Sequence, residues 1–228
     1  RGPLHGGANE EAMKMLQEIT SVKEVKAFVD EKIENKEKLK VSNNSENKLL
    51  LLEHNPVITL GRRTKIEHLL ESKEEIVKKG IDIFEIDRGG SATYHGPGQL
   101  VGYIICKSSR LGGIHNLINL ILKSINNVMD MYGISSYIDN ENPGIWTDTP
   151  LPRKLAALGM SNNKGITMHG FAINLDMPLT GFSIIVPCGL TLPVSTIAIE
   201  TGEKIGMIKL KEDICDAILT ELKKYYNE

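Results

Sequence analysis

The chain has 228 residues, of which 41% are hydrophobic and 25% are charged, and its formal net charge is -2. This balance is typical of a globular protein and excludes a mainly disordered or fibrous chain, while the charge excludes a general affinity for nucleic acid. No apolar run approaches the roughly 20 residues that a membrane span needs, so no membrane partner is expected.

The predicted elements follow residues 1–7, which have no periodicity and are interpreted as a cloning or processing remnant. Two short helices come next, one capped by Asn9 and one starting at Ser21. Apolar periodicity then predicts strands over 48–53, 57–60, 81–86, 99–106, 145–146, 154–160 and 166–175, and helices over 66–79, 113–132 and 209–226. Without an internal repeat or a linker, these elements predict a single domain over 8–228 of the α/β (α+β) class.

Three cysteines form an odd set without CxxC spacing, which argues against a disulfide framework and a structural zinc site. Cys106 in a predicted strand and Cys215 in the last helix are interpreted as core or neutral residues. Cys188 stands between a proline and a glycine, where a thiol is sterically open and backbone amides are available for an oxyanion. Simple packing is the alternative for Cys188, because free cysteines are usually buried. The histidines show no metal-binding spacing.

Residues 88–99 (RGGSATYHGPGQ) are the least ordinary segment, with four glycines, a proline, an arginine and a histidine between two predicted strands. Glycines let a backbone approach a ligand closely, whereas a long structural turn is the alternative. The segment has neither the Gly-Lys-Ser/Thr ending of a phosphate-binding loop nor the glycine spacing of a dinucleotide-binding loop. It is therefore a candidate ligand-binding segment without a nucleotide motif.

Lys154 opens a stretch, 155–159, that is otherwise apolar. A lysine at the start of a strand is usually solvated, and that remains the alternative. Beside a thiol, its ammonium group would stabilise the thiolate, which a free cysteine with a pKa of about 8.5 populates only to a few per cent at neutral pH. His169 could orient a substrate or could be a hydrogen-bonded core histidine.

Taken together, these segments resemble those of the lipoyl(octanoyl) transferase family over roughly residues 48–200. The resemblance rests on segments 49–62, 88–99, 154–159, 169–175 and 187–189, which occur in the family's order. The chain departs from the family pattern at Asn55, where a second proline is common, and at 150–152.

The resemblance implies a fold similar to biotin and lipoate protein ligases, with a mixed β-sheet flanked by helices. It also implies that Cys188 is the nucleophile that carries an acyl thioester and that Lys154 is its activating partner. The acyl and carrier-arm site would be lined by Arg88, Gly89, Gly90, Ser91, Ala92, Thr93, Tyr94, His95, Ala157, Leu158, Gly159, His169, Gly170, Phe171 and Ala172.

By the same resemblance, the chain is expected to be an acyltransferase acting in the first step of endogenous protein lipoylation. It would move an octanoyl or lipoyl group from acyl carrier protein to a lysine of a lipoyl domain, in a 2-oxoacid dehydrogenase or the glycine cleavage H protein. No ATP, metal or other cofactor is expected. The expected location is soluble, in the cytoplasm, a mitochondrion or a plastid. A basic docking face for acidic partners, or an ordinary solvated surface, would comprise Arg62, Arg63, Lys65, Arg88 and Arg153.

Two alternatives remain open on the sequence. An ATP-dependent lipoate or biotin ligase of the same fold would leave Cys188 incidental and would show ATP–pyrophosphate exchange with a free fatty acid. A non-catalytic acyl-carrier or lipoyl-domain binding protein would bind these partners without forming an adduct on Cys188. The presence of both Cys188 and Lys154 favours the transferase.

Overall fold

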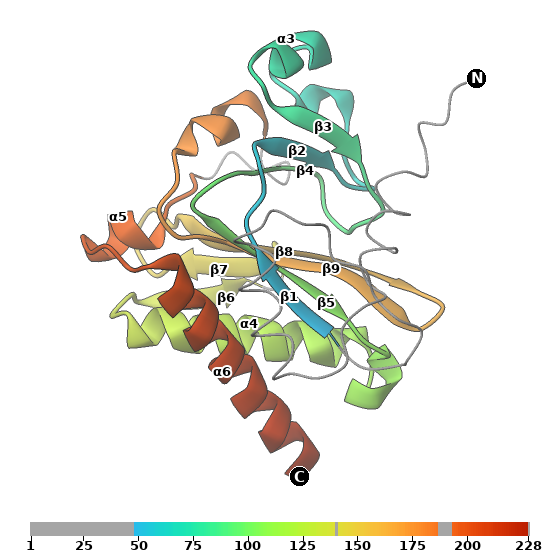
Figure 1. The fold of residues 1–228 in the computed structure, drawn as a ribbon, viewed down its shortest axis with the longest axis vertical. Coiled ribbons are helices and arrows are strands. Elements are labelled where there is room, and N and C mark those ends of the chain that lie inside the picture. The colour runs from blue at the N-terminus through green and yellow to red at the C-terminus, as the bar shows by residue number, and fades with distance from the viewer. Residues whose placement is uncertain (1–47, 140, 187–192, 228) are drawn as a thin grey trace.

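The computed structural model describes residues 48–139, 141–186 and 193–227, which form two β-sheets with helices packed around them (Figure 1). The remnant and the two helices predicted before residue 48 lie outside the described residues, and so does Cys188. Within the described ranges, no helix is long and apolar enough to cross a bilayer.

The larger sheet has six strands in the order β1-β5-β9-β8-β7-β6, and every neighbouring pair is antiparallel. Its strands are β1 (Lys48–Leu52), β5 (Gln99–Ile105), β6 (Ser136–Asp139), β7 (Gly144–Thr147), β8 (Lys154–Asn163) and β9 (Ile166–Asn174). A two-residue turn joins β8 to β9, and both of its residues, Lys164 (φ 51°) and Gly165 (φ 83°), have the positive φ that such hairpins require.

The smaller sheet has the order β3-β2-β4, with β2 (Val57–Leu60) parallel to β3 (Asp82–Glu85) and antiparallel to β4 (Ala92–His95). The predicted α/β class is confirmed, and mixed pairing is confined to this smaller sheet. The two strands predicted on either side of Asn55 exist, but they belong to different sheets, since β1 pairs with β5.

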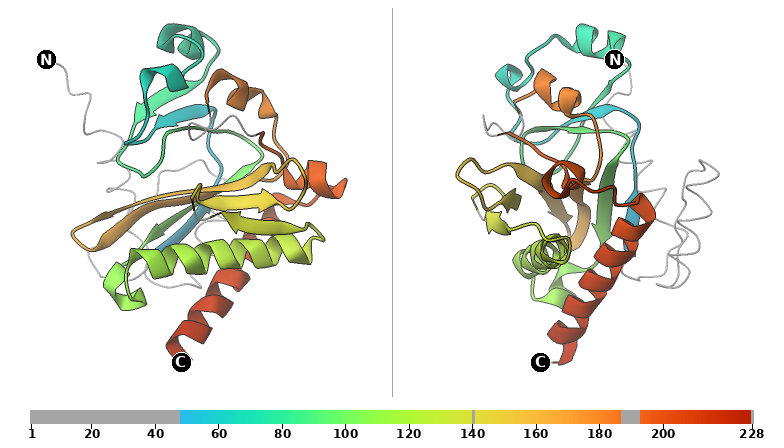
Figure 2. Two further views of the ribbon diagram at one scale, coloured as in Figure 1. Left: turned by 180° about the vertical axis from the view of Figure 1, so that it is seen from behind. Right: turned by 90° about the vertical axis from the view of Figure 1, so that its left-hand side faces the viewer.

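The helices α4 (Ile114–Met131) and α6 (Met207–Asn227) pack on the larger sheet on the side away from the smaller sheet (Figures 1 and 2). Apolar residues at helical spacing, such as Leu117, Ile121 and Ile125, bury one face of α4 in the larger core. The remaining helices are α3 (Lys73–Lys78), α5 (Ile197–Thr201), η1 (Ile66–His68), η2 (Ser108–Leu111) and η3 (Leu179–Ile184).

The single helix predicted over 66–79 is wrong, because the chain breaks between η1 and α3. Ser72 caps α3 by accepting a hydrogen bond from the amide of Glu75 (3.3 Å). The amide of Leu70 donates to the carbonyl of Ile184 (2.9 Å) instead of continuing a helix. Three elements had not been predicted from the sequence: β6, α5 and β4, the last of which lies inside the glycine-rich segment.

Candidate functional site

The glycine-rich segment meets the larger sheet at β8. The amide of Gly89 donates a hydrogen bond to the carbonyl of Met160 (3.1 Å). A Cβ atom at position 159 would lie 3.0 Å from the carbonyl oxygen of Gly89, which is closer than side chains normally approach. Gly159 therefore lets two predicted site segments pack directly on each other.

The residues predicted to line the acyl site divide into two sets. Residues 157–159 of β8 pair with residues 170–172 of β9, so these two segments are neighbours. Partly exposed are Gly89, Gly90, His95, Ala157, Leu158, Gly159 and His169, whereas Arg88, Ser91, Ala92, Thr93, Tyr94, Gly170, Phe171 and Ala172 are buried. The partly exposed residues can contact a ligand, whereas the buried residues pack behind them.

Two aromatic rings in the buried set pack against glycines. Tyr94 meets Phe182 edge-on, with ring centroids 5.6 Å apart, and a Cβ at Gly181 would lie 2.4 Å from the tyrosine ring. Phe171 covers Gly102, where a Cβ would lie 2.2 Å from the ring. Both rings therefore belong to the packed walls behind the site.

Arg88 points into the protein and anchors the glycine-rich segment to β2. It is 7% exposed, and its Nη2 donates to the carbonyl oxygen (2.7 Å) and the hydroxyl (2.9 Å) of Thr59. The prediction that Arg88 belongs to a basic docking face is therefore wrong. Arg153, the other distant member of that face, makes a two-pronged ion pair with Glu200 (2.8 and 2.7 Å).

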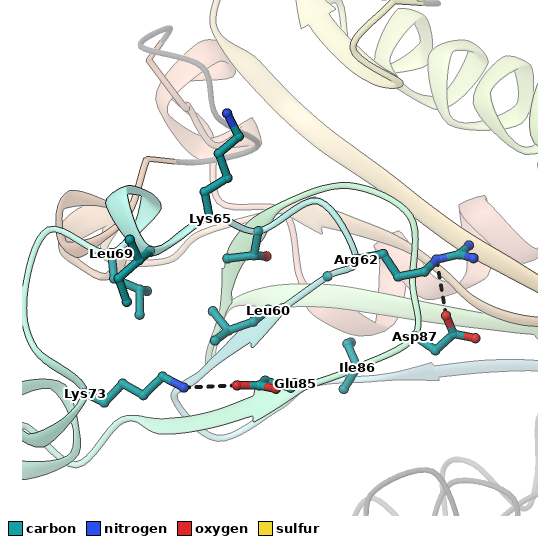
Figure 3. A pocket seen from close by; sticks show the side chains of 11 residues that line it. Leu60, Arg62, Lys65, Leu69, Lys73, Glu85, Ile86 and Asp87 are labelled. Atoms are coloured by element: carbon teal, nitrogen blue, oxygen red, sulfur yellow. Dashed lines mark hydrogen bonds and ion pairs between the residues drawn. The ribbon is translucent and has the colours of Figure 1, made fainter. Parts of the chain in front are cut away.

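A surface pocket of about 530 Å³ lies beside the exposed residues Arg62 and Lys65 (Figure 3). The charges around it are largely compensated, because Arg62 pairs with Asp87 (3.2 Å) and Lys73 pairs with Glu85 (3.1 Å). The pocket therefore lacks the unbalanced positive charge that a strong anion site needs. Among the described residues, no cluster of histidine, cysteine and acidic side chains could hold a metal ion.

Lys154 begins β8 and is buried, at 6% exposed, so the solvated alternative is wrong. Its Nζ lies 4.9 Å from the ring centroid of Trp146, which faces it from β7. Its amide donates to the carbonyl of Pro193 (2.9 Å), and its carbonyl accepts from the amide of Ser195 (3.0 Å). Lys154 is thus held on both its backbone and its side chain.

Described residues on both sides of the segment that contains Cys188 are hydrogen-bonded to other parts of the chain. Before it, the amide of Val186 donates to the carbonyl of His68 (2.9 Å), and Ile185 bridges to Leu69. After it, Pro193 bonds to Lys154 as described. Cys188 itself lies outside the described residues, and its role stays a prediction.

A buried polar network links His95 to the backbone around Lys154. Nδ1 of His95 donates to Oε1 of Gln99 (2.7 Å), and Nε2 of Gln99 donates to Oδ1 of Asn174 (2.9 Å). Asn174 in turn donates to the carbonyl of Ser195 (3.0 Å). The network ties β4, β5 and β9 to the chain segment that pairs with Lys154.

Burial keeps two histidines of the site neutral. It lowers the pKa of His95 to about 3, assisted by the nearby charges of His54 and Arg88, while the hydrogen bond to Gln99 opposes the shift. Burial and the charge of Arg88 lower the pKa of His169 to about 4. His169 also has a left-handed backbone (φ 64°), and its buried Nε2 has no hydrogen-bond partner among the described residues. The alternative of a fully hydrogen-bonded core histidine is therefore wrong.

Between pH 6.5 and about 5, the free energy of unfolding is expected to fall by about 1.4 kcal/mol per pH unit for each of His95 and His169. The folded state stays unprotonated because both pKa values are lowered, whereas the unfolded state binds a proton below its ordinary pKa of 6.5. Urea unfolding at several pH values measures this slope. His95→Gln should reduce this slope, and an unchanged slope in that variant would contradict the prediction.

The prediction that Cys106 is a core residue is confirmed, since the residue is 5% exposed and its thiol is hydrogen-bonded to Thr167. Burial raises the pKa of this thiol.

Trp146 and Asn174 were not predicted as parts of the site. Trp146 is the sole tryptophan in the chain and could have been noticed eight residues before Lys154. No local signal in the sequence marks Asn174.

The lipoyl protein ligase A/B catalytic domain is the family whose model matches residues 29–219 of this chain. A model of the citrate synthase C-terminal domain matches residues 1–40, which lie outside the described structure. An octanoyltransferase of Dictyoglomus thermophilum is 41% identical over 184 residues, which cover 80% of this chain and 77% of that protein. An octanoyltransferase of Caldicellulosiruptor saccharolyticus is 47% identical over 156 residues, covering 67% and 65%.

Solved structures with the same fold include lipoate protein ligases. A lipoate-protein ligase A bound with ATP has a TM-score of 0.59 at 16% identity, covering 90% of this chain and 81% of that one. A bi-partite lipoate protein ligase from Thermoplasma acidophilum has a TM-score of 0.55 at 16% identity, covering 93% and 82%. The prediction of a lipoate-ligase-like fold is therefore confirmed.

Proposed function

This chain belongs to the family of lipoyl protein ligase A/B catalytic domains, and we propose that it is an octanoyltransferase of protein lipoylation that carries the acyl group as a thioester on Cys188. The proposed donor is octanoyl-acyl carrier protein. The proposed acceptor is a lysine of a lipoyl domain, in a 2-oxoacid dehydrogenase or the glycine cleavage H protein. Curated relatives named octanoyltransferase support this assignment over most of the chain.

The observation that carries the proposal is the burial of Lys154 beside the chain that follows Cys188. Cys188 is two residues from Val186, whose amide donates to the carbonyl of His68, and five from Pro193, whose carbonyl accepts from the amide of Lys154. These separations allow the thiol to reach the ammonium group, because an extended chain spans about 3.5 Å per residue. A buried ammonium group favours a neighbouring thiolate more strongly than a solvated one would.

Two half-reactions follow from this pair. The Cys188 thiolate attacks the thioester carbonyl of the donor, the carbon–sulfur bond to the carrier arm breaks, and the departing sulfur takes a proton from Lys154. The acceptor amine then attacks the acyl group on Cys188, the thiolate leaves again, and neutral Lys154 accepts the amine proton. Because one thioester replaces another, the first half-reaction needs no ATP, and the proposal includes no nucleotide or metal.

Substrate selection is proposed to be graded with acyl length. Each methylene that is buried against apolar side chains, of which Leu158 is a partly exposed example, contributes about 0.8 kcal/mol. Neighbouring chain lengths should therefore compete within about an order of magnitude.

Intact mass spectrometry after incubation with octanoyl-acyl carrier protein tests the proposed function. The wild type should gain one octanoyl group, Cys106→Ala and Cys215→Ala should also gain it, and Cys188→Ala should not. The adduct should disappear when a lipoyl domain is added, with the octanoyl group recovered on that domain. ATP–pyrophosphate exchange with free octanoate, in the absence of an adduct, would instead establish an ATP-dependent ligase.

A further inference from the structure

Lys154 lies in a slot that is built by β6 and β7. A Cβ atom at Gly144 would lie 2.7 Å from Cε of Lys154, so the lysine methylenes occupy the space that a larger residue would take. Two residues further along β7, the indole ring of Trp146 faces Nζ at 4.9 Å from its centroid. An ammonium group at this distance from an indole face is attracted by the ring, and the attraction strengthens when water is excluded.

The indole ring is itself held in place. Its Nε1 donates to the carbonyl of Asn142 (3.3 Å), and Trp146 is only 1% exposed. Asp139 accepts hydrogen bonds from the amides of Glu141 (2.8 Å) and Asn142 (3.0 Å), which shapes the turn between β6 and β7. The ring therefore cannot move away from Lys154 without disturbing this turn.

A negative charge completes the slot. Burial alone would raise the pKa of Asp139, but its hydrogen bonds from Asn142 and Glu141 and the nearby charge of Lys154 outweigh burial and lower that pKa. Asp139 is therefore ionised at neutral pH. It is the cross-strand partner of Gly144, so its side chain lies on the same face of the β6–β7 pair as the contact of Gly144 with Lys154. An indole face and a carboxylate both attract an ammonium group.

We propose that Trp146 is a positioning residue that fixes the side chain of Lys154 in this slot, where the lysine serves to activate the reacting sulfur. The inference rests on the proposed function, because the sulfur is that of Cys188. In this role Trp146 acts only through Lys154. The slot holds the lysine side chain in one place before the donor arrives.

The pH dependence of Cys188 alkylation by iodoacetamide tests this role, with Cys188 followed by peptide mass spectrometry and Cys106 and Cys215 as internal references. Trp146→Leu removes the ring face and should raise the midpoint of the pH–rate curve by about half to one unit, a roughly three- to tenfold lower rate below the midpoint. Trp146→Phe keeps a weaker ring face and should retain a substantial part of the wild-type rate.

Two further variants make the result decisive. Tyr132→Leu removes a ring from the contact between α4 and α6, where its hydroxyl donates to Asp213 (2.6 Å), and should leave the midpoint unchanged. Lys154→Met should raise the midpoint at least as far as Trp146→Leu does. If Lys154→Met shifts the midpoint and Trp146→Leu does not, Trp146 only packs, and the proposed function stands. If neither shifts it, the inference fails together with the activating role of Lys154, while the octanoyl adduct still decides whether Cys188 carries the acyl group.

Discussion

Replacing Lys154 by methionine is expected to lower the rate of octanoyl transfer by about 10²–10⁴-fold while the protein stays folded. Methionine is about as long as the lysine stem and can fill the slot between Gly144 and Trp146, so packing is largely kept. The variant lacks both the charge that stabilises the thiolate and the proton that the departing sulfur needs. Single-turnover transfer from octanoyl-acyl carrier protein, followed by mass spectrometry, measures the loss.

The matched control for this change is Lys209→Met. Lys209 is exposed on α6, where it pairs with Asp213, so the same chemical change there should leave the transfer rate within about twofold of the wild type. A Lys154→Met enzyme that forms the acyl adduct at the wild-type rate would show that Lys154 does not activate the thiol.

Gly98→Ala is expected to destabilise the protein by about 3 kcal/mol and to reduce activity with it. Gly98 has φ +85°, which a residue with a Cβ adopts only with strain, and that Cβ would lie 2.0 Å from the backbone oxygen of Asp176. The carbonyl of Gly98 also accepts from the amides of Leu175 and Asp176 (both 3.1 Å). A shift at this position therefore disturbs the junction between the glycine-rich segment and the end of β9.

Gly202→Ala separates the effect of backbone conformation from that of crowding. Gly202 ends α5 with φ +70°, but an added Cβ would meet no atom within 4 Å. We expect a loss of only about 1 kcal/mol there, measured by urea unfolding of both variants. Equal losses at the two positions would mean that the contact with Asp176 relaxes without cost and that the packing argument is wrong.

The hydrogen bonds of Asn174 illustrate how the fold supports the site from a distance. Its side chain accepts from Gln99 and donates to Ser195, so one buried amide joins two strands of the larger sheet to the chain that pairs with Lys154. A buried amide with both functions satisfied rigidifies its surroundings, because breaking either bond would leave a polar group without a partner.

Local patterns in the sequence were sufficient for several elements. Apolar periodicity predicted α4, β5, β8 and β9, since this signal depends on neighbours within a few positions. The order of the short motifs was sufficient to identify the family. The position of Lys154 at the start of an apolar stretch was sufficient to single out this residue.

Only the tertiary structure decided which residues surround Lys154 and which strands pair. The strands on either side of Asn55 separate into two sheets because β1 finds its partner in β5, about fifty residues further along the chain. Arg88 turns inward because Thr59 offers it two oxygen acceptors, and the helix over 66–79 breaks because Leu70 bonds to Ile184. These partners are distant in sequence. A local pattern carries no information about which distant group will hydrogen-bond to a buried charge or amide, or which group will pack on an indole ring.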